Sequence, residues 1–308
     1  MERYEQAVQQ WQNWNMQTVA DIDQYLDNFR ILFAYHSGKI ENAEITYHDT
    51  REIFENGKVT GYTGSPRALF EQQNQKLCYE VLKEKIAAKN PISVELIQEI
   101  HRVLTSGTYD ERRYIDKGER PGEFKKHDYV TGIHEVGSAP EEVESDLREL
   151  IDEVNEVGRK NPLKAGAYLH AQFEYIHPFA DGNGRVGRTL LNYWLMVNDY
   201  PPMIIYEEDK NEYYLALQAY DEAEDLDALT DFFKKADSKN LGAVDESGGG
   251  SEAGASWSHG TAVIKPNRLR MHTENGVHFS FRKSEKLSRF SGVVVVLLCV
   301  AKGGHCDA

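Results

Sequence analysis

The strongest constraint on the fold is the recurrence of apolar residues every three or four positions along most of the first 240 residues. This spacing places the apolar side chains on one face of an α-helix, which must then pack against another element. The segments with this pattern are 66–88, 93–104, 139–157, 162–177 and 188–198, with a shorter pair between 210 and 235. Ser93 stands where the second of them would need an N-cap. The sequence therefore predicts an all-α fold, a helical bundle.

Two segments depart from this helical pattern. Residues 111–138 are rich in glycine and charge, and we expect a long loop with a small β-hairpin around 129–133. The glycine- and serine-rich sequence near the C-terminal end predicts a flexible linker and a poorly defined tail. We therefore divide the chain into N-terminal helices (1–60), a helical core (61–240), and a linker and tail (241–308) that we expect to be disordered or atypical.

Charge and cysteine content narrow the class of partner. The formal net charge is −15, so a nucleic-acid-binding surface is not expected, and an anionic ligand would need a local positive pocket. The three cysteines do not suggest a disulfide framework, and the first residues lack the apolar stretch of a signal peptide. The longest apolar run, 293–301, is about half of a membrane helix. We expect a soluble, cytoplasmic protein with no nucleic-acid or membrane partner.

The stretch HPFADGNGRVGR, residues 177–188, lies between two of the predicted helices. Gly182, Asn183 and Gly184 come just before a helix start, where backbone N–H groups and the helix dipole attract anions. Arg185 and Arg188 are three positions apart, so both guanidiniums would face one ligand. These residues would supply the local positive pocket that the acidic chain otherwise lacks.

Two more residues of this stretch suit work on a bound nucleotide. Asp181 offers the oxygen ligand that Mg²⁺ prefers in proteins. His177 has a side chain that accepts protons near neutral pH. An ordinary turn between helices would explain the glycines alone, but the order of chemical types favours phosphoryl or nucleotidyl transfer.

At these residues the sequence resembles the Fic family, named for filamentation induced by cyclic AMP. The family pattern, His-x-Phe-x-Asp/Glu-Gly-Asn-Gly-Arg-x-x-Arg, is met at every position from His177 to Arg188. The resemblance covers about residues 20–235. It implies a Fic-fold bundle that transfers AMP from ATP to a Ser, Thr or Tyr hydroxyl of a target protein, or of itself, and releases pyrophosphate.

The same resemblance assigns a role to each residue of the motif. His177 would take the proton of the target hydroxyl, and Asp181 would hold Mg²⁺ on the α- and β-phosphates. The phosphate-binding residues would be Gly182, Asn183, Gly184, Arg185 and Arg188. Within this set, the glycine amides and the asparagine would support the α-phosphate, the first arginine the β-phosphate and the second the γ-phosphate.

Two other segments match parts of the family fold. A β-hairpin flap lies over the active site of Fic proteins, and its edge would dock an extended target segment by strand addition. Here the flap residues would be Val130, Thr131, Gly132 and Ile133. The segment 213–222 resembles the helix that closes the adenine pocket. Adjacent helical residues point about 100° apart, so we expect only one of Tyr213 and Tyr214 to face the base.

Residues 37–42, SGKIEN, follow a predicted amphipathic helix and resemble the inhibitory pattern Ser/Thr-x-x-x-Glu-Gly/Asn. Their place ahead of the motif is that of the Fic subgroup with an N-terminal inhibitory helix. Ser37 and Glu41 are four positions apart and share a helix face. A carboxylate on Arg188 would occupy the guanidinium that the γ-phosphate needs, so ATP would bind in an unproductive pose.

Three alternative functions stay open. In some Fic relatives the same glutamate supports removal of AMP, so this site could act as a deAMPylase. His170 and His177 are two helical turns apart and could join Asp181 in a metal-dependent hydrolase, although that leaves both arginines unexplained. The third alternative is a non-catalytic Fic-fold binding module. The sequence does not show whether the protein forms a homodimer.

Overall fold

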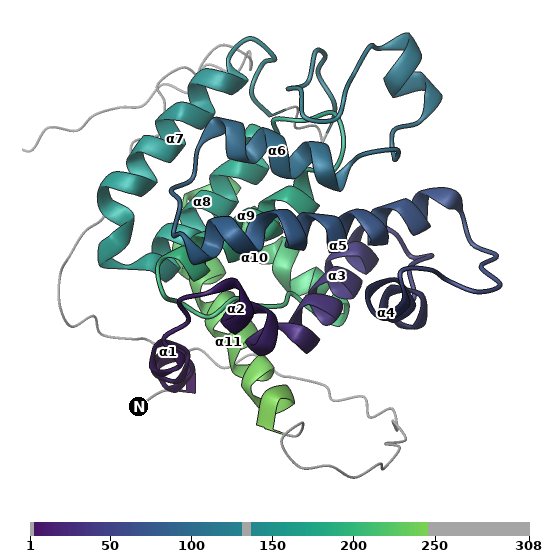
Figure 1. The fold of residues 1–308 in the computed structure, drawn as a ribbon. Helices are drawn as coiled ribbons and strands as arrows, with labels where there is room; N and C mark the ends of the chain where they lie inside the picture. Colours follow the sequence, from purple (N-terminus) through teal and green to yellow (C-terminus); the bar gives the residue numbers. More distant parts are fainter. Residues whose placement is uncertain (1–2, 131–136, 246–308) are drawn as a thin grey trace, which may run out of the picture. The chain divides into compact units, whose positions relative to one another are not determined.

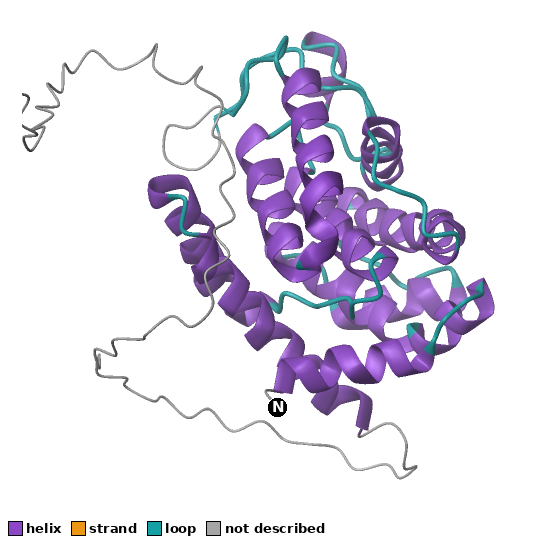
Figure 2. Cartoon of the chain, turned by 90° about the vertical axis from the view of Figure 1, so that its left-hand side faces the viewer, coloured by secondary structure: helices purple, strands orange, loops and turns teal. Residues whose placement is uncertain are grey.

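The computed structural model describes residues 3–130 and 137–245, and every regular element within these ranges is helical (Figures 1 and 2). The α-helices are α1 (Arg3–Trp14), α2 (Val19–Tyr25), α3 (Asp27–Glu41), α4 (Tyr47–Asn56), α5 (Pro66–Ala87), α6 (Val94–Leu104), α7 (Val143–Val157), α8 (Pro162–Ile176), α9 (Asn183–Val197), α10 (Lys210–Ala223) and α11 (Leu226–Asp245). Three short helical turns are η1 (Arg112–Asp116), η2 (Gly158–Lys160) and η3 (Glu207–Asp209). The predicted all-α fold is confirmed.

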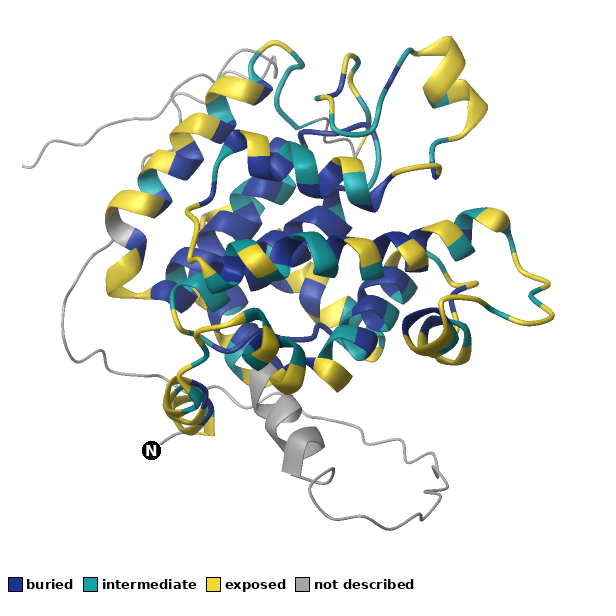
Figure 3. Ribbon diagram, viewed as in Figure 1, coloured by how far each residue is buried: buried dark blue, intermediate teal, exposed yellow. Residues whose placement is uncertain are grey.

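Helices α8 and α9 form the centre of the bundle, where buried residues concentrate (Figure 3). Leu169 and Phe173 of α8, like Val186 and Leu190 of α9, are 0% exposed. Helices α7 and α11 pack on α8, whereas α5 and α6 pack on α9. Helix α3 contacts both α5 and α9, so the N-terminal part of the chain reaches the helix that begins in the motif.

Local signals set most helix boundaries. The Ser93 hydroxyl accepts the Leu96 N–H at 3.2 Å and caps α6 as predicted. Helix α7 begins at Val143 rather than at 139, because the chain first turns through a bond from the Glu142 N–H to the Ala139 carbonyl. Helix α9 begins at Asn183 rather than at 188, so both motif arginines lie in its first turns.

Part of the predicted hairpin and most of the predicted tail lie outside the described residues. Thr131, Gly132 and Ile133 fall in this category, whereas Val130 is described and is 73% exposed. Helix α11 continues to Asp245, beyond the boundary drawn at 240, and residues 246–308 are not described. Among the described helices, none combines the length and the apolar character of a membrane span.

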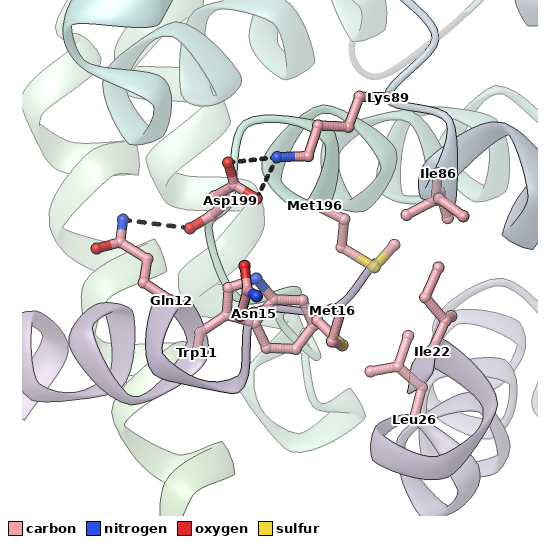
Figure 4. A pocket seen from close by; sticks show the side chains of 11 residues that line it. Trp11, Gln12, Asn15, Met16, Ile22, Leu26, Ile86, Lys89, Met196 and Asp199 are labelled. Atoms are coloured by element: carbon pink, nitrogen blue, oxygen red, sulfur yellow. Dashed lines mark hydrogen bonds and ion pairs between the residues drawn. The ribbon is translucent and has the colours of Figure 1, made fainter. Parts of the chain in front are cut away.

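A pocket of 240 Å³ lies at the end of α9 opposite the motif, roughly 20 Å away along the helix (Figure 4). Trp11, Ile22 and Met196 line its apolar part. At its rim the Lys89 ammonium bonds both Asp199 carboxylate oxygens, at 2.7 and 2.6 Å. The chain around α1 and the end of α5 therefore meets the C-terminal end of α9 here, at the end of the helix away from the motif.

Shortening a central leucine tests the α8–α9 core. Leu190→Ala should lower the free energy of unfolding by about 2–5 kcal/mol, since it leaves a cavity at a site with no exposed surface. Urea unfolding measures this loss. Leu77→Ala, at a residue that is 48% exposed, is the matched control. Equal losses in the two variants would contradict the placement of the core.

Candidate active site

Two residues with positive φ shape the turn that joins α8 to α9. His177 (φ 50) ends α8, and its N–H bonds the Phe173 carbonyl at 3.0 Å. Gly182 (φ 84) precedes α9, and a β-carbon there would lie 2.6 Å from Cγ2 of Thr105. Glycine is therefore required at 182 by conformation and by space.

The Asn183 side chain holds this turn closed. Its Oδ1 accepts the Phe179 N–H at 2.9 Å, and its Nδ2 donates to the Phe179 carbonyl at 2.8 Å. Phe179 is 0% exposed and anchors the turn in the core. Asn183 is the first residue of α9, where backbone N–H groups have no intrahelical acceptor, so the group it could offer to an anion is its backbone N–H.

His101 of α6, which no sequence pattern indicated, packs against the turn and bonds its backbone. Its ring stacks on Phe179 with centroids 3.7 Å apart. The Gly122 N–H donates to Nδ1 at 2.8 Å, so the proton is on Nε2, which donates to the Asp181 carbonyl at 3.0 Å. Burial lowers the pKa of His101 to about 3. Apolar spacing in 93–104 indicates only a core position for this residue.

Arg188 is 2% exposed and bound by the N-terminal helix α3. Its Nη2 lies 2.8 Å from Oε1 of Glu41 and 2.9 Å from the Ser37 carbonyl, and its Nε donates to the Ser37 hydroxyl at 3.1 Å. Burial acts to lower the pKa of Arg188, but Glu41 outweighs it and the pKa is raised. The predicted contact of Glu41 with Arg188 is therefore present, and Ser37 adds two bonds that the sequence did not predict.

The Glu41 carboxylate lies directly against Gly184, at the positive end of α9. Burial alone would raise the pKa of Glu41, but Arg188 and Arg185 hold it below its usual value. Lys210 of α10 also lowers the pKa of Glu41. The Lys210 ammonium donates to the carbonyl of Ile40, the residue before Glu41. An ionised carboxylate therefore occupies the position where the motif would hold a phosphate.

Arg185 is also 2% exposed and faces another acid, the buried Glu71 of α5. Its Nη1 lies 3.2 Å from Oε1 of Glu71, and its Nη2 lies 3.8 Å from Oδ1 of Asp181. The Asn42 amide, next to Glu41, donates to the other Glu71 oxygen at 2.9 Å. Each motif arginine therefore faces an acid that comes from a helix outside the motif, and the sequence indicated only one of the two.

Asp181, the predicted magnesium ligand, is paired with Arg67 of α5, whose Nη2 lies 2.8 Å from Oδ2. The described residues contain no group of three or more His, Cys, Asp or Glu side chains that could hold a metal ion. The carboxylate fits a magnesium ion only as a single protein ligand, so the other ligands would be phosphate oxygens and water, as in nucleotide sites.

The two candidate tyrosines of α10 have different environments. Tyr213 is 1% exposed, and its hydroxyl lies 2.7 Å from Nε2 of His170, which is 0% exposed. Tyr214 is 41% exposed and is the one available to a base. His170 is thus engaged in the core with Tyr213, away from the turn, which removes the geometric basis of a metal site shared with His177.

His177 lies at the turn between two anchor points of the preceding long loop. The Lys125 N–H donates to the Pro178 carbonyl at 2.9 Å, and the Ser138 N–H donates to the Ile176 carbonyl at 3.0 Å. Burial, reinforced by Lys125, lowers the pKa of His177 to about 4. The imidazole is therefore neutral at pH 7 and can accept a proton.

Residues 91–195 match the Fic/DOC family. Protein adenylyltransferase Fic of Drosophila willistoni is 29% identical over 195 residues, which are 62% of this chain and 36% of that protein. Protein adenylyltransferase fic-1 of Caenorhabditis elegans is 29% identical over 194 residues, 60% of this chain and 35% of that protein. The chain thus spans little more than a third of the length of these relatives.

Solved structures have the same fold. A Fic domain-containing signaling protein from Bacteroides thetaiotaomicron superposes with a TM-score of 0.70 and 24% identity, over 82% of this chain and 100% of that one. Fic-1 of C. elegans superposes with a TM-score of 0.65 and 24% identity, over 80% of this chain and 72% of that one. The fold is that of Fic proteins, and the residues that match the Fic/DOC family, 91–195, contain the motif.

Burial of His170 predicts a pH dependence of stability. Burial lowers its pKa from 6.5 to about 3, so between these values the unfolded chain binds a proton that the folded chain does not. The contribution of this residue to stability should therefore fall by about 1.4 kcal/mol per pH unit as the pH falls below about 6.5. His170→Asn should reduce the slope of unfolding free energy against pH by that amount between about pH 6 and 4.

Urea unfolding at several pH values measures both slopes. His48→Asn, at an exposed position, is the matched control. Glu174 acts in the opposite sense, because burial raises its pKa to about 8, and the comparison of variants cancels its contribution. An unchanged slope in His170→Asn would show that this imidazole is not buried in the neutral form.

Proposed function

We propose that the protein is an adenylyltransferase that moves AMP from ATP to a Ser, Thr or Tyr hydroxyl of a target protein or of itself, and that Glu41 inhibits it. The observation that carries the proposal is the pair of buried arginines at the N-terminus of α9, beside a neutral histidine. The names of the relatives support the same reaction class.

The chemistry needs positioning more than covalent participation. The Nε2 or Nδ1 atom of His177 takes the proton of the target hydroxyl as its oxygen attacks the α-phosphorus. The bond from this phosphorus to the oxygen that bridges to the β-phosphate breaks, and pyrophosphate leaves. Arg185 and Arg188 hold the outer phosphates, and the first N–H groups of α9 face the α-phosphate.

A magnesium ion bound with the nucleotide would neutralise phosphate charge beside Asp181. Other residues of the chain would bind the base and the target. Tyr214, exposed beside the buried Tyr213, would contact the adenine. The loop segment anchored at both flanks of His177 would dock an extended stretch of the target, with Val130 at its described edge.

Inhibition follows from competition for one guanidinium. The Glu41 carboxylate occupies Arg188 and the N-terminal end of α9 at once, so a γ-phosphate must displace it or bind elsewhere. Because Glu41 lies at the C-terminal end of α3, movement of that helix end would release Arg188 without rebuilding the turn. We propose that ATP binds the inhibited protein in an unproductive pose. Removal of AMP by the same site stays a prediction from the resemblance.

Removing the inhibitory carboxylate tests the proposal. Glu41→Gly should raise transfer of labelled AMP from α-labelled ATP by about tenfold or more, since an ion pair of about 1.4 kcal/mol corresponds to that factor. His177→Ala in the same background should abolish labelling. Glu44→Gly, at an exposed acid in the following turn, is the matched control and should leave labelling unchanged.

The contact between Glu41 and Arg188 leads to a second prediction. In an Arg188→Ala background the Glu41→Gly change should be nearly silent, because the guanidinium that it frees is absent. Additive effects of the two changes would argue against a common contact. A Glu41→Gly protein that binds ATP but labels neither itself nor any protein of a lysate would refute the transferase.

Ser37→Ala gives a graded version of the same release. It removes the hydroxyl bond to Nε of Arg188 but leaves the bonds from the Ser37 carbonyl and from Glu41. Labelling should rise by less than in Glu41→Gly, about twofold to fivefold for the loss of one hydrogen bond of ~0.5–1 kcal/mol. A larger rise than in Glu41→Gly would mean that the carboxylate is not the main inhibitory group.

A further inference from the structure

Three guanidiniums converge on the Asp181 carboxylate from three separate elements. Nη2 of Arg67, from α5, lies 2.8 Å from Oδ2, and Nη1 of Arg113, from η1, lies 4.0 Å from the same oxygen. Nη2 of Arg185, from α9, lies 3.8 Å from Oδ1. The acid that the motif would offer to a cation is therefore surrounded by positive charge.

The three arginines differ in their freedom to move. Arg185 is 2% exposed and held in the core, and Arg113 pairs with Asp110 beside it. The Arg67 side chain is 41% exposed, and its Nε bonds Glu71 at 3.0 Å. Arg67 is therefore the most exposed of the three, against 30% for Arg113, and has the most room to leave Asp181.

A divalent cation and Arg67 compete for the same carboxylate. Magnesium binds oxygen at about 2.0–2.1 Å, so an ion on Asp181 would lie within about 5 Å of the guanidinium. The repulsion between these charges is about 2 kcal/mol even with the dielectric constant of water. The phosphates of a nucleotide reverse the balance, because their negative charge attracts the ion and the guanidinium alike.

We propose that Arg67 keeps Asp181 closed to divalent cations until a nucleotide has entered, and then passes from the carboxylate to the phosphate oxygens. The inference rests on the proposed function, because it assumes a nucleotide at the N-terminus of α9. It assigns a positioning role to a residue outside the motif. The order of binding follows: the cation enters with the nucleotide and not before it.

Binding of Mn²⁺ to the full chain without nucleotide tests the first half of the proposal. Electron paramagnetic resonance measures free Mn²⁺ directly and does not depend on transfer activity. The wild-type protein should leave the Mn²⁺ signal close to that of buffer. Arg67→Gln should bind Mn²⁺ on the order of tenfold more tightly, and Asp181→Asn in the same background should abolish this gain.

Two further variants separate charge from general effects. Arg67→Lys keeps the positive charge and should exclude Mn²⁺ as the wild type does. Arg51→Gln removes the same charge from an exposed ion pair with Glu55 on α4 and should also behave as the wild type. Mn²⁺ binding by the wild type as tight as by Arg67→Gln, or a gain that survives Asp181→Asn, would overturn the proposal.

Nucleotide binding with excess chelator tests the second half. Without any divalent cation, Arg67→Gln should bind ATP on the order of tenfold more weakly than Arg51→Gln, because a phosphate contact is lost. Equal affinities would overturn the transfer of Arg67 to the phosphates. Failure of AMP labelling would refute the proposed function alone, since the Mn²⁺ result needs no reaction.

Discussion

The site depends on the need of a buried guanidinium for a counter-charge. Arg188 is 2% exposed, and a cation at such a position must be paired and hydrogen-bonded. In the structure α3 supplies both, through the Glu41 carboxylate and the Ser37 carbonyl and hydroxyl. A nucleotide would supply the same charge through phosphate. The arginine can thus satisfy its requirement in two ways, one from within the chain and one from a ligand.

The rest of the site is built so that this exchange does not disturb the turn. Asn183 closes the turn on the backbone of Phe179, and His101 holds the Asp181 carbonyl from α6. These contacts lie beneath the anion site and involve no group that a phosphate would need. The buried Glu71 carboxylate is likewise the counter-charge of Arg185. The Asn42 amide bonds this carboxylate and so links it to the end of α3.

Sequence reasoning predicted the elements whose signals are local. The helical repeat, the N-cap at Ser93 and the chemical order of residues 177–188 depend on short stretches, and the structure confirms the all-α fold and the helix cap. The contact of Glu41 with Arg188 is also present. The roles of the site residues, the flap and the domain boundaries stay predictions.

The site residues that the sequence did not indicate come from helices that meet only in the folded protein. Arg67, Glu71 and His101 carry no motif, and each looks like an ordinary helix residue until α5 and α6 are packed against α9. The sequence could not say which of Tyr213 and Tyr214 is exposed, because that depends on which face of α10 meets α8. The predicted start of α9, at 188, is five residues late, because Gly184 and Gly187 lie inside the helix although glycine is a weak helix former.

The loop anchors at Pro178 and Ile176 have a consequence for how such an enzyme can diversify. Each end of the segment between Lys125 and Ser138 is fixed to a carbonyl next to His177, the proposed proton acceptor. Under the proposed function, substitutions within the segment would change which polypeptide is recognised, while the two anchors would keep a bound hydroxyl in place at the imidazole. Target choice and chemistry would then vary as separate traits.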